Sequence, residues 1–324
     1  MNREEFLRAG ALACLGMIGG GWPGPPPLQA GQLSVPFRVG FHRGLFTDLP
    51  EADARAAVMA WGMAVARERG IEVDPSTQLF DHPQEIVNAL RHGSVDSVSA
   101  GFPEYAVIAA QVPTGPWFLT QTSGALFEEY VLLAHAQAGH GSLAALQGAL
   151  LLLHGSARMS LARDWLDLLV MGSGQIGGAQ AFFGEVRQVK KASGAALPVF
   201  FGQADACVVT QSAFDTLCEL NPQLGRSLVV LDRSRPLVPA VMFFRSTYDS
   251  PDKASLITAL NELHRTPAGQ QVLALFQSEA LVQVDEKPLK ETQAFLAEVR
   301  SLRAGRGGTE MVPPTTSKQG IATS

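Results

Sequence analysis

The sequence has few cysteines, few charged residues and no apolar run long enough for a membrane anchor. Its three cysteines, Cys14, Cys207 and Cys218, are too few for a zinc ribbon or a disulfide scaffold. Charged residues make up 17% of the 324 positions and hydrophobic residues 46%, which excludes a disordered chain. The net charge of −5 argues against a general nucleic-acid binder, so we expect no nucleic-acid partner.

Motifs of enzymes and metal sites are also missing. The chain has no Gly-x-Ser-x-Gly elbow, no Walker loop and no His-Glu-x-x-His pair. Residues 172–178 are rich in glycine but follow an expected helix, so we interpret them as a loop and not as a phosphate cradle. We interpret Cys207 and Cys218 as buried thiols, with a disulfide or a reactive thiol as the alternatives. We therefore expect no catalysis, no cofactor and no metal.

Residues 1–30 have the layout of a secretory signal peptide. Arg3 and Arg8 lie near the start, residues 9–21 are small and apolar, and a proline-rich break follows. This run is shorter than the roughly 20 apolar residues that a membrane span requires. Acylation at Cys14 is the weaker alternative. We expect export to the periplasm, and a disordered tail over residues 304–324.

Between these ends, short apolar runs alternate with amphipathic stretches, a pattern that predicts an α/β fold with mostly parallel sheets. The run 149–153 is apolar throughout, as expected of a parallel strand buried on both faces. The expected strands are 37–41, 71–80, 95–100, 130–134, 149–153, 186–189, 204–209 and 240–244. The expected helices are 47–70, 83–92, 103–111, 142–147, 161–171, 195–201, 212–221, 254–264, 267–277 and 290–302.

One local pattern occurs twice. In each copy a helix ends at glycine (Gly93 or Gly202), and an aspartate (Asp96 or Asp205) then leads into an apolar strand. We interpret the two segments as equivalent positions in two similar lobes. Residues 33–123 and 237–303 are expected to form the first lobe and residues 124–236 the second.

In a parallel α/β lobe, ligands lie beyond the carboxyl ends of the strands, where helices begin. Four expected loops satisfy this condition: 41–43, 101–105, 154–160 and 210–212. The third follows the most apolar strand, and its hydroxyls and forked cation suit a carboxylate or phosphate. The candidate ligand-binding residues are His42, Arg43, Gly101, Glu104, Tyr105, His154, Ser156, Arg158, Ser160, Thr210 and Gln211.

Each of these residues also has a purely structural interpretation. In this interpretation Ser156 or Ser160 only caps a helix, and Arg158 is a solvated surface charge. Glu104 and Tyr105 have capping and packing as alternatives, and the two histidines have ordinary structural hydrogen bonding. If Arg158 does bind an anion, its removal is expected to weaken binding with little change in stability.

Several stretches resemble the phosphate, phosphite and phosphonate substrate-binding proteins of ABC transporters. The resemblance covers about residues 36–300, and its closest stretches are Glu129–Leu133, Ser142–Gly148, Pro198–Ala206, Ser212–Gln223 and Thr266–Val272. It implies the two-lobed type II periplasmic-binding-protein fold, with a ligand cleft and two hinge crossovers. It also implies that the lobes close over a ligand and deliver it to a membrane permease, and we expect a monomer.

The sequence departs from this family at three ligand positions. Only Ser156 and Ser160 stand where relatives have a Ser-Thr-Ser run, and Ala100 replaces a tyrosine. An expected histidine is missing, because Lys191-Ala192-Ser193 occupies that stretch. A small anion other than a phosphonate therefore fits the resemblance equally well.

Three functions remain open at this point. The first is a periplasmic protein that captures a small anionic solute for an ABC importer, without chemistry. The second is a ligand-sensing partner of a membrane signalling protein. The third is an enzyme on a binding-protein scaffold, with Cys207 or His154 as the reactive group.

Overall fold

Two β-sheets carry the fold of the part of the chain that the structure describes. The computed structural model describes residues 36–46, 52–53, 55–56, 59–60, 62, 74 and 78–306. The expected signal peptide and the tail beyond residue 306 lie outside these residues and stay predictions. Every described position between 52 and 62 is helical, as expected for the helix after residue 47.

The first sheet has six strands in the order β11-β4-β10-β3-β1-β2. Its strands β1, β2 and β3 pair in parallel, whereas β4, β10 and β11 pair antiparallel with their neighbours. The bounds are β1 (Val39–His42), β2 (Gln78–Phe80), β3 (Ser97–Gly101), β4 (Thr114–Gln121), β10 (Ala240–Arg245) and β11 (Ala280–Val284).

The second sheet has five strands in the order β7-β6-β8-β5-β9. Pairing is parallel among β6, β7 and β8, and antiparallel between β5 and its neighbours β8 and β9. The bounds are β5 (Tyr130–His135), β6 (Leu150–His154), β7 (Glu185–Val189), β8 (Ala206–Thr210) and β9 (Leu228–Arg233).

The two-lobed α/β architecture agrees with the expectation, but both sheets are mixed rather than mostly parallel. The chain leaves the first sheet through β4 and returns through its neighbour β10. It enters the second sheet through β5 and leaves through its neighbour β9. An exit strand and a return strand that lie side by side run in opposite directions, so each crossover adds an antiparallel pair.

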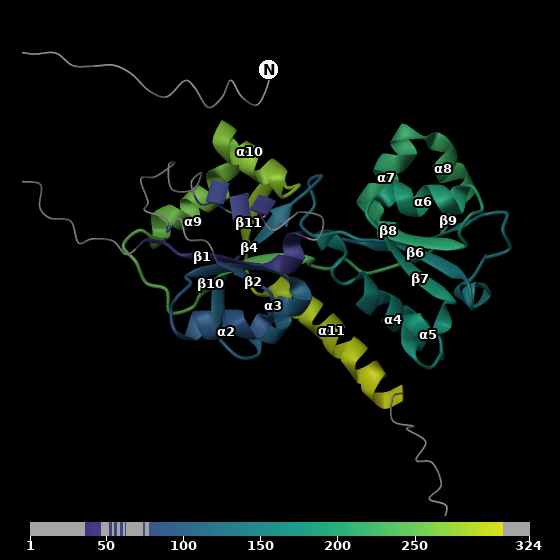
Figure 1. Ribbon diagram of the computed structural model, residues 1–324, viewed down its shortest axis with the longest axis horizontal. Helices are drawn as coiled ribbons and strands as arrows, with labels where there is room; N and C mark the ends of the chain where they lie inside the picture. Colours follow the sequence, from purple (N-terminus) through teal and green to yellow (C-terminus); the bar gives the residue numbers. More distant parts are fainter. Residues whose placement is uncertain are drawn as a thin grey trace, which may run out of the picture. The chain divides into compact units, whose positions relative to one another are not determined.

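Helices cover both faces of each sheet (Figure 1). Helices α9 and α10 lie on one face of the first sheet, with α2 and α3 on the other. Helices α6, α7 and α8 lie on one face of the second sheet, with α4 and α5 on the other. The bounds are η1 (Arg43–Phe46), α2 (Pro83–Arg91), α3 (Phe102–Ala109), η2 (Leu143–Leu146), η3 (Ala157–Met159), α4 (Ala162–Gly172), α5 (Gly178–Phe182), α6 (Ala192–Phe200), α7 (Gln211–Leu220), α8 (Pro222–Ser227), α9 (Lys253–Glu262), η4 (Leu263–Arg265), α10 (Pro267–Leu275) and α11 (Lys287–Arg306).

The last helix, α11, continues four residues beyond the expected end at residue 302. Its Phe295 and Val299 are fully buried in a hydrophobic cluster that includes residues of both sheets. Nearer its end, Arg303 forms ion pairs with Asp164 and Asp167 of α4. Helix α11 therefore packs on elements of both sheets.

The repeated glycine-to-aspartate pattern has the same geometry in both sheets. Gly93 and Gly202 follow α2 and α6 with φ angles of 64° and 68°, a left-handed conformation that favours glycine. The Asp96 carboxylate accepts the backbone N–H of Arg38 at 3.0 Å, just before β1. The Asp205 carboxylate accepts the backbone N–H of Leu150 at 2.7 Å, at the start of β6. Each aspartate thus fixes the start of the parallel strand beside it.

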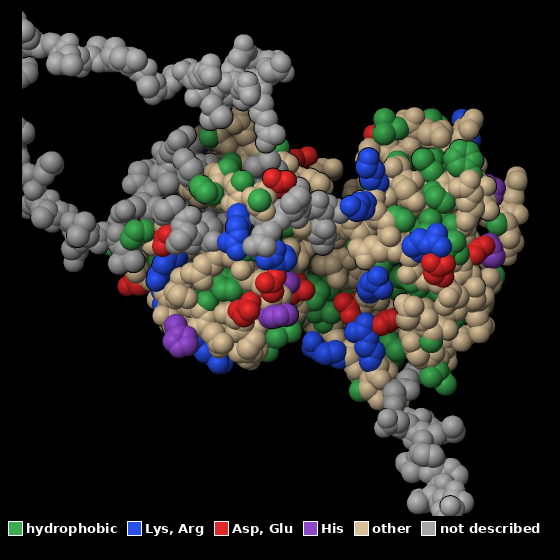
Figure 2. Space-filling view, in the orientation of Figure 1, with side chains coloured by type: hydrophobic (Ala, Val, Ile, Leu, Met, Phe, Trp, Pro, Cys, Tyr) green, Lys and Arg blue, Asp and Glu red, His purple; other side chains and the backbone are tan. Residues whose placement is uncertain are grey.

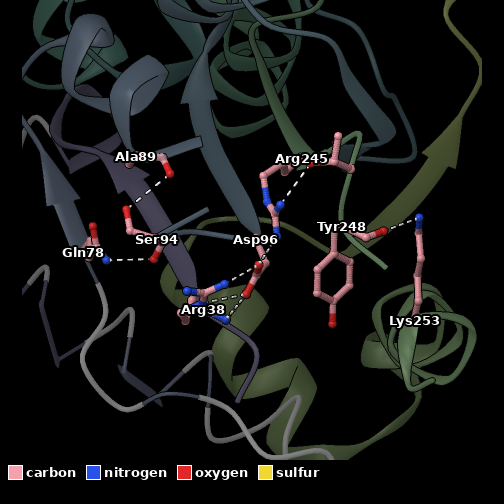
Figure 3. A network of polar contacts seen from close by, with 9 residues as sticks. Arg38, Gln78, Ala89, Ser94, Asp96, Arg245, Tyr248 and Lys253 are labelled. Carbon is pink, nitrogen blue, oxygen red and sulfur yellow. Dashed lines mark hydrogen bonds and ion pairs between the residues drawn. The ribbon is translucent and has the colours of Figure 1, made fainter. Parts of the chain in front are cut away.

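Asp96 has a second role that Asp205 does not share. Its buried carboxylate lies between two guanidinium groups, Arg38 at 2.9 Å and Arg245 at 3.0 Å (Figure 3). Arg38 precedes β1 and Arg245 ends β10, so one carboxylate connects the strands on both sides of β3. This arrangement makes Asp96 a central polar contact of the first sheet.

The two crossovers between the sheets pair with each other. Glu128 and Leu237 exchange two backbone hydrogen bonds, of 2.8 and 2.9 Å, as an isolated antiparallel bridge. Both residues are buried. The outgoing and returning segments therefore form a short two-stranded connection.

Candidate functional site

Two cavities lie beside the segments that follow β1 and β6. One has a volume of about 200 Å³ and contains both signs of charge, so we call it the charged pocket. The other, of about 220 Å³, is mainly apolar, and we call it the apolar cavity. The charged pocket is lined by Gly44, Leu45, Gly101, Pro103, Glu104, Leu153, His154, Gly155, Ser156, Ala157, Met159, Ser160, Arg163 and Gln188.

Five of the eleven predicted residues line the charged pocket together: Gly101, Glu104, His154, Ser156 and Ser160. They come from the ends of β3 and β6 and from the helical turns that follow. Parallel α/β units place such loops at one edge of a sheet, and these residues were predicted because they lie in such loops. Their location agrees with the expectation, while their role in binding stays a prediction.

The first-sheet wall of the pocket is the start of α3. Gly101 is the residue before the helix, and Glu104 lies in its first turn. A Cβ at Gly101 would lie 2.5 Å from Oε2 of Glu104, so the missing side chain lets this carboxylate fold back over the backbone. Glu104 thereby presents a negative charge to the pocket.

The second-sheet wall combines Arg163 of α4 with Gln188 of β7. The Arg163 guanidinium donates to Oε1 of Gln188 at 3.5 Å. The Gln188 side chain lies against Gly155, where a Cβ would be 2.2 Å from Nε2. Arg163 is exposed and has no ion-pair partner among the described residues. Arg163 is therefore a cation of this pocket whose charge is available to a ligand.

Arg163 and Gln188 are not among the residues predicted from the sequence. A signal for Arg163 exists, because a positive charge in the first turn of a helix opposes the helix dipole and lowers stability. Gln188 lies in register with Leu153 of β6, so it marks the same strand end as His154. Pairing the expected strands 149–153 and 186–189 in parallel would have identified it.

The two predicted serines differ in what their hydroxyls do. Ser160 donates to the carbonyl of Pro239 at 2.7 Å, so its proton is already used. Ser156 is the residue before η3, and its side chain makes no capping hydrogen bond. Ser156 lines both cavities, so this residue lies where they adjoin.

Arg158 has a different partner from the one expected. Its guanidinium forms an ion pair with Glu128 and donates to the hydroxyl of Thr122. Glu128 is 97% buried in its side chain, and burial raises the pKa of its carboxyl although Arg158 acts in the opposite direction. Arg158 lines the apolar cavity, but it is neither a solvated surface charge nor an unpaired cation. The expectation that its loss leaves stability nearly unchanged is therefore corrected.

The other five predicted residues do not line either cavity. The buried His42 accepts from the Gly44 amide at Nδ1 (3.2 Å) and donates from Nε2 to the Asp81 carbonyl (3.1 Å). Arg43 pairs with Asp81, and this contact lowers the pKa of the aspartate. These two residues support the loop after β1.

Tyr105, Thr210 and Gln211 also have local structural contacts. Tyr105 is buried against Phe102 and Phe243, its hydroxyl lies 3.3 Å from that of Thr114, and burial raises its pKa. Thr210 caps α7 by accepting from the Ala213 amide at 3.2 Å. Gln211 donates to Asp215 one turn further along α7.

The apolar cavity is bordered by aromatic side chains. Phe41, Phe46 and Phe276 form a triangle with ring centroids 5.8–5.9 Å apart. Leu45, Ser156 and Ala157 line both this cavity and the charged pocket. The remaining lining residues are Ser99, Thr120, Arg158, Pro239, Ala240, Val241, Met242, Leu273, Gln277, Ser278 and Leu281.

Cys207 and Cys218 are both free, which overturns the disulfide alternative. Burial raises the pKa of both thiols, strongly for Cys207 inside β8, and neither lines a cavity. Within the described ranges, no three His, Cys, Asp or Glu side chains group as they do around a metal ion. None of the helices described there has both the length and the apolar character of a membrane span.

Residues 44–289 match the profile of a protein family described as the periplasmic substrate-binding protein of phosphonate ABC transporters. The match includes both walls of the charged pocket. A comparison with curated protein sequences returned no match.

Solved structures share the fold at low sequence identity. XAC2383 from Xanthomonas citri, bound to chloride, is 19% identical with a TM-score of 0.56, over 82% of this chain and 99% of that one. A binding-protein component of an ABC phosphonate transporter from Pseudomonas aeruginosa (PA3383) is 13% identical with a TM-score of 0.55, over 85% and 90%. PhnD1 from Prochlorococcus marinus, in complex with methylphosphonate, is 13% identical with a TM-score of 0.54, over 82% and 98%.

Proposed function

The chain belongs to the family of periplasmic substrate-binding proteins of phosphonate ABC transporters, and from this premise we propose that it binds a small oxyanion-bearing solute in the charged pocket. The family has a small-molecule ligand and a permease as its partners, and its members are transport proteins rather than enzymes. We further propose that this protein delivers its solute to an ABC permease without changing it. The family match favours this role over a sensor of a signalling protein.

The observation that carries the proposal is the available charge of Arg163 in a pocket that Ser156 also lines. An exposed guanidinium offers several N–H donors in a fork that matches the oxygens of a phosphonate, a phosphate or a carboxylate. The Ser156 hydroxyl adds a neutral donor to the lining of the same pocket. Glu104 on the opposite wall accepts hydrogen bonds, so the favoured solute has an oxyanion at one end and a donor group near it.

Replacing Arg163 by glutamine tests this site. A hydrogen bond to a charged group contributes about 1.5–3 kcal/mol, so Arg163→Gln should weaken binding about ten- to a hundredfold. Titration calorimetry with inorganic phosphate, methylphosphonate and aminomethylphosphonate measures the change. Arg187→Gln is the matched control, because Arg187 is exposed on β7, pairs with Glu185 and lines neither cavity. Equal affinity in wild type and Arg163→Gln would place the oxyanion elsewhere.

The bridge between Glu128 and Leu237 supports a hinge at the two crossovers. We propose that residues 33–123 with 237–303, and residues 124–236, are lobes that close over the solute. The Arg158 side chain belongs to the second lobe and reaches Thr122 and Glu128 on the outgoing segment. Closure in this proposal keeps those contacts and moves the walls of the charged pocket together.

We propose that residues 1–30 direct export and are removed. The charged start, the apolar run 9–21 and the proline-rich break support this proposal. N-terminal sequencing of the protein from the periplasm should begin near Gly31. Recovery of soluble protein that still starts at Met1 would contradict export by cleavage.

A further inference from the structure

The apolar cavity exists because one small residue stands between two large ones on the first sheet. Ser99 of β3 lies in register with Phe41 of β1 and with Met242 of β10. Side chains directly opposite one another on neighbouring strands lie on the same face of a sheet. A serine at this position therefore leaves a gap between a phenyl ring and a thioether, where a leucine or phenylalanine would fill the face.

The walls above this gap are apolar and partly aromatic. Phe46 and Phe276 contact Phe41 and each other, and Leu273 of α10 is also buried beside the cavity. The volume of about 220 Å³ exceeds the roughly 150 Å³ of an apolar cavity known to take up benzene. The one charged side chain of its lining, Arg158, is neutralised by Glu128. The cavity thus has the size and chemistry for an aromatic ring or a short alkyl chain.

The cavity is continuous in its lining with the charged pocket. Leu45, Ser156 and Ala157 line both, so these three residues lie where the two cavities adjoin. A solute held by its oxyanion at Arg163 and Ser156 can therefore extend an apolar group toward Ser99. Two adjoining subsites of opposite character are the arrangement expected for a ligand with a charged head and an apolar substituent.

We infer that the solute carries an aryl group or an alkyl group larger than methyl, and that this group occupies the apolar cavity. The inference rests on the proposed function, since the charged pocket holds the head of the same molecule. It goes beyond that function by naming the substrate class: an oxyanion with a hydrophobic substituent rather than a bare oxyanion.

The test compares two phosphonates that differ in the apolar group alone. Calorimetric titration of the mature protein should show benzylphosphonate binding at least tenfold more tightly than methylphosphonate. In Ser99→Leu, which fills the gap between Phe41 and Met242, the ratio of the two affinities should fall to about one. Ser99→Ala is the matched control, because it removes the hydroxyl without filling the gap, and it should keep the wild-type ratio.

Three outcomes overturn the inference while leaving the proposed function intact: equal affinities in the wild type, an unchanged ratio in Ser99→Leu, or a ratio lost equally in Ser99→Ala. If neither phosphonate binds, the phosphonate-type head of the proposed function fails instead. Toluene then reports on the cavity alone: it should raise the melting temperature of the wild type and of Ser99→Ala. No shift with toluene would mean that the cavity takes up no apolar group. Circular dichroism verifies the fold of each variant, and Ser99→Ala with toluene keeps the test decisive if Ser99→Leu fails to fold.

Discussion

Replacing Arg158 by methionine is expected to lower the free energy of unfolding by about 3–5 kcal/mol, because removing one partner of a buried ion pair leaves the other charge uncompensated. The group left without its partner is the carboxylate of Glu128, whose side chain is only 3% exposed. Methionine keeps most of the apolar length of the arginine, so packing changes contribute less than the lost charge. Urea unfolding followed by circular dichroism measures the difference.

The loss in Arg158→Met should depend on pH in a definite direction. Burial already raises the pKa of Glu128, and without Arg158 the pKa of this carboxyl rises further in the folded state. A raised folded-state pKa gives stability that is present at low pH and is lost as the carboxyl ionises. The gap between wild type and variant should therefore be small near pH 4 and widen as the pH rises above the ordinary pKa of a glutamate.

The double variant Arg158→Met/Glu128→Gln is the control. It removes both charges, so it should recover most of the lost stability and show no widening gap with pH. A single variant as stable as the wild type at pH 7 would contradict the account, since Glu128 would then have another source of compensation. Loss of stability in the single variant and its recovery in the double variant would identify Arg158 as the partner of a structural ion pair and not as an anion-binding arginine.

Asp96→Asn is expected to lower the free energy of unfolding by about 3 kcal/mol. The change removes the negative charge between Arg38 and Arg245, whose side chains are 28% and 22% exposed. Two partly buried guanidinium groups then lose the carboxylate that lies between them, across the strands that flank β3. The exposed parts of both arginines keep the cost at the lower end of the range for a broken buried pair.

Asp205→Asn is the matched comparison within the same molecule. Asp205 occupies the equivalent position in the second sheet, but its side chain is 42% exposed and its ionic partner is His140 at 3.4 Å. An asparagine there still accepts the Leu150 amide, and an exposed pair contributes at most about 1 kcal/mol. Equal losses in the two variants, measured by thermal unfolding, would show that the backbone contact alone matters and not the two arginines.

The alternation of short apolar runs with helical periodicity was sufficient to predict the parallel strands of both sheets, together with β5 and β10. It also located both copies of the glycine-to-aspartate turn, because a left-handed glycine and a strand-starting aspartate are local signals. Strand β4 was missed, since it opens with Thr114-Gly115-Pro116, residues that are rare inside strands. Strands β9 and β11 were missed as well, as each follows a helix without a clear alternating pattern.

The site was predictable to the level of loops rather than of side chains. Residues after β3 and β6 converge because the ends of parallel strands share one edge, a rule of topology that needs no side-chain information. The pairing of Arg158 with Glu128 joins residues 30 positions apart across a crossover, and no local pattern contains it. Whether a cation is available to a ligand depends on such distant partners.

The same ion pair also changes the balance of charge in the two cavities. Among the described residues that line the two cavities, the charges are those of Glu104, Arg158 and Arg163, and Glu128 neutralises Arg158. The remaining pair, one acid and one base, has no net charge, and Figure 2 shows Lys, Arg, Asp and Glu side chains interspersed over the described surface. Clefts lined by one sign of charge accelerate the capture of charged molecules by 10- to 1,000-fold and lose that advantage as salt is added. If the solute binds as we propose, the charges that line these cavities provide no attraction of a single sign, and we expect its capture rate to change little with ionic strength.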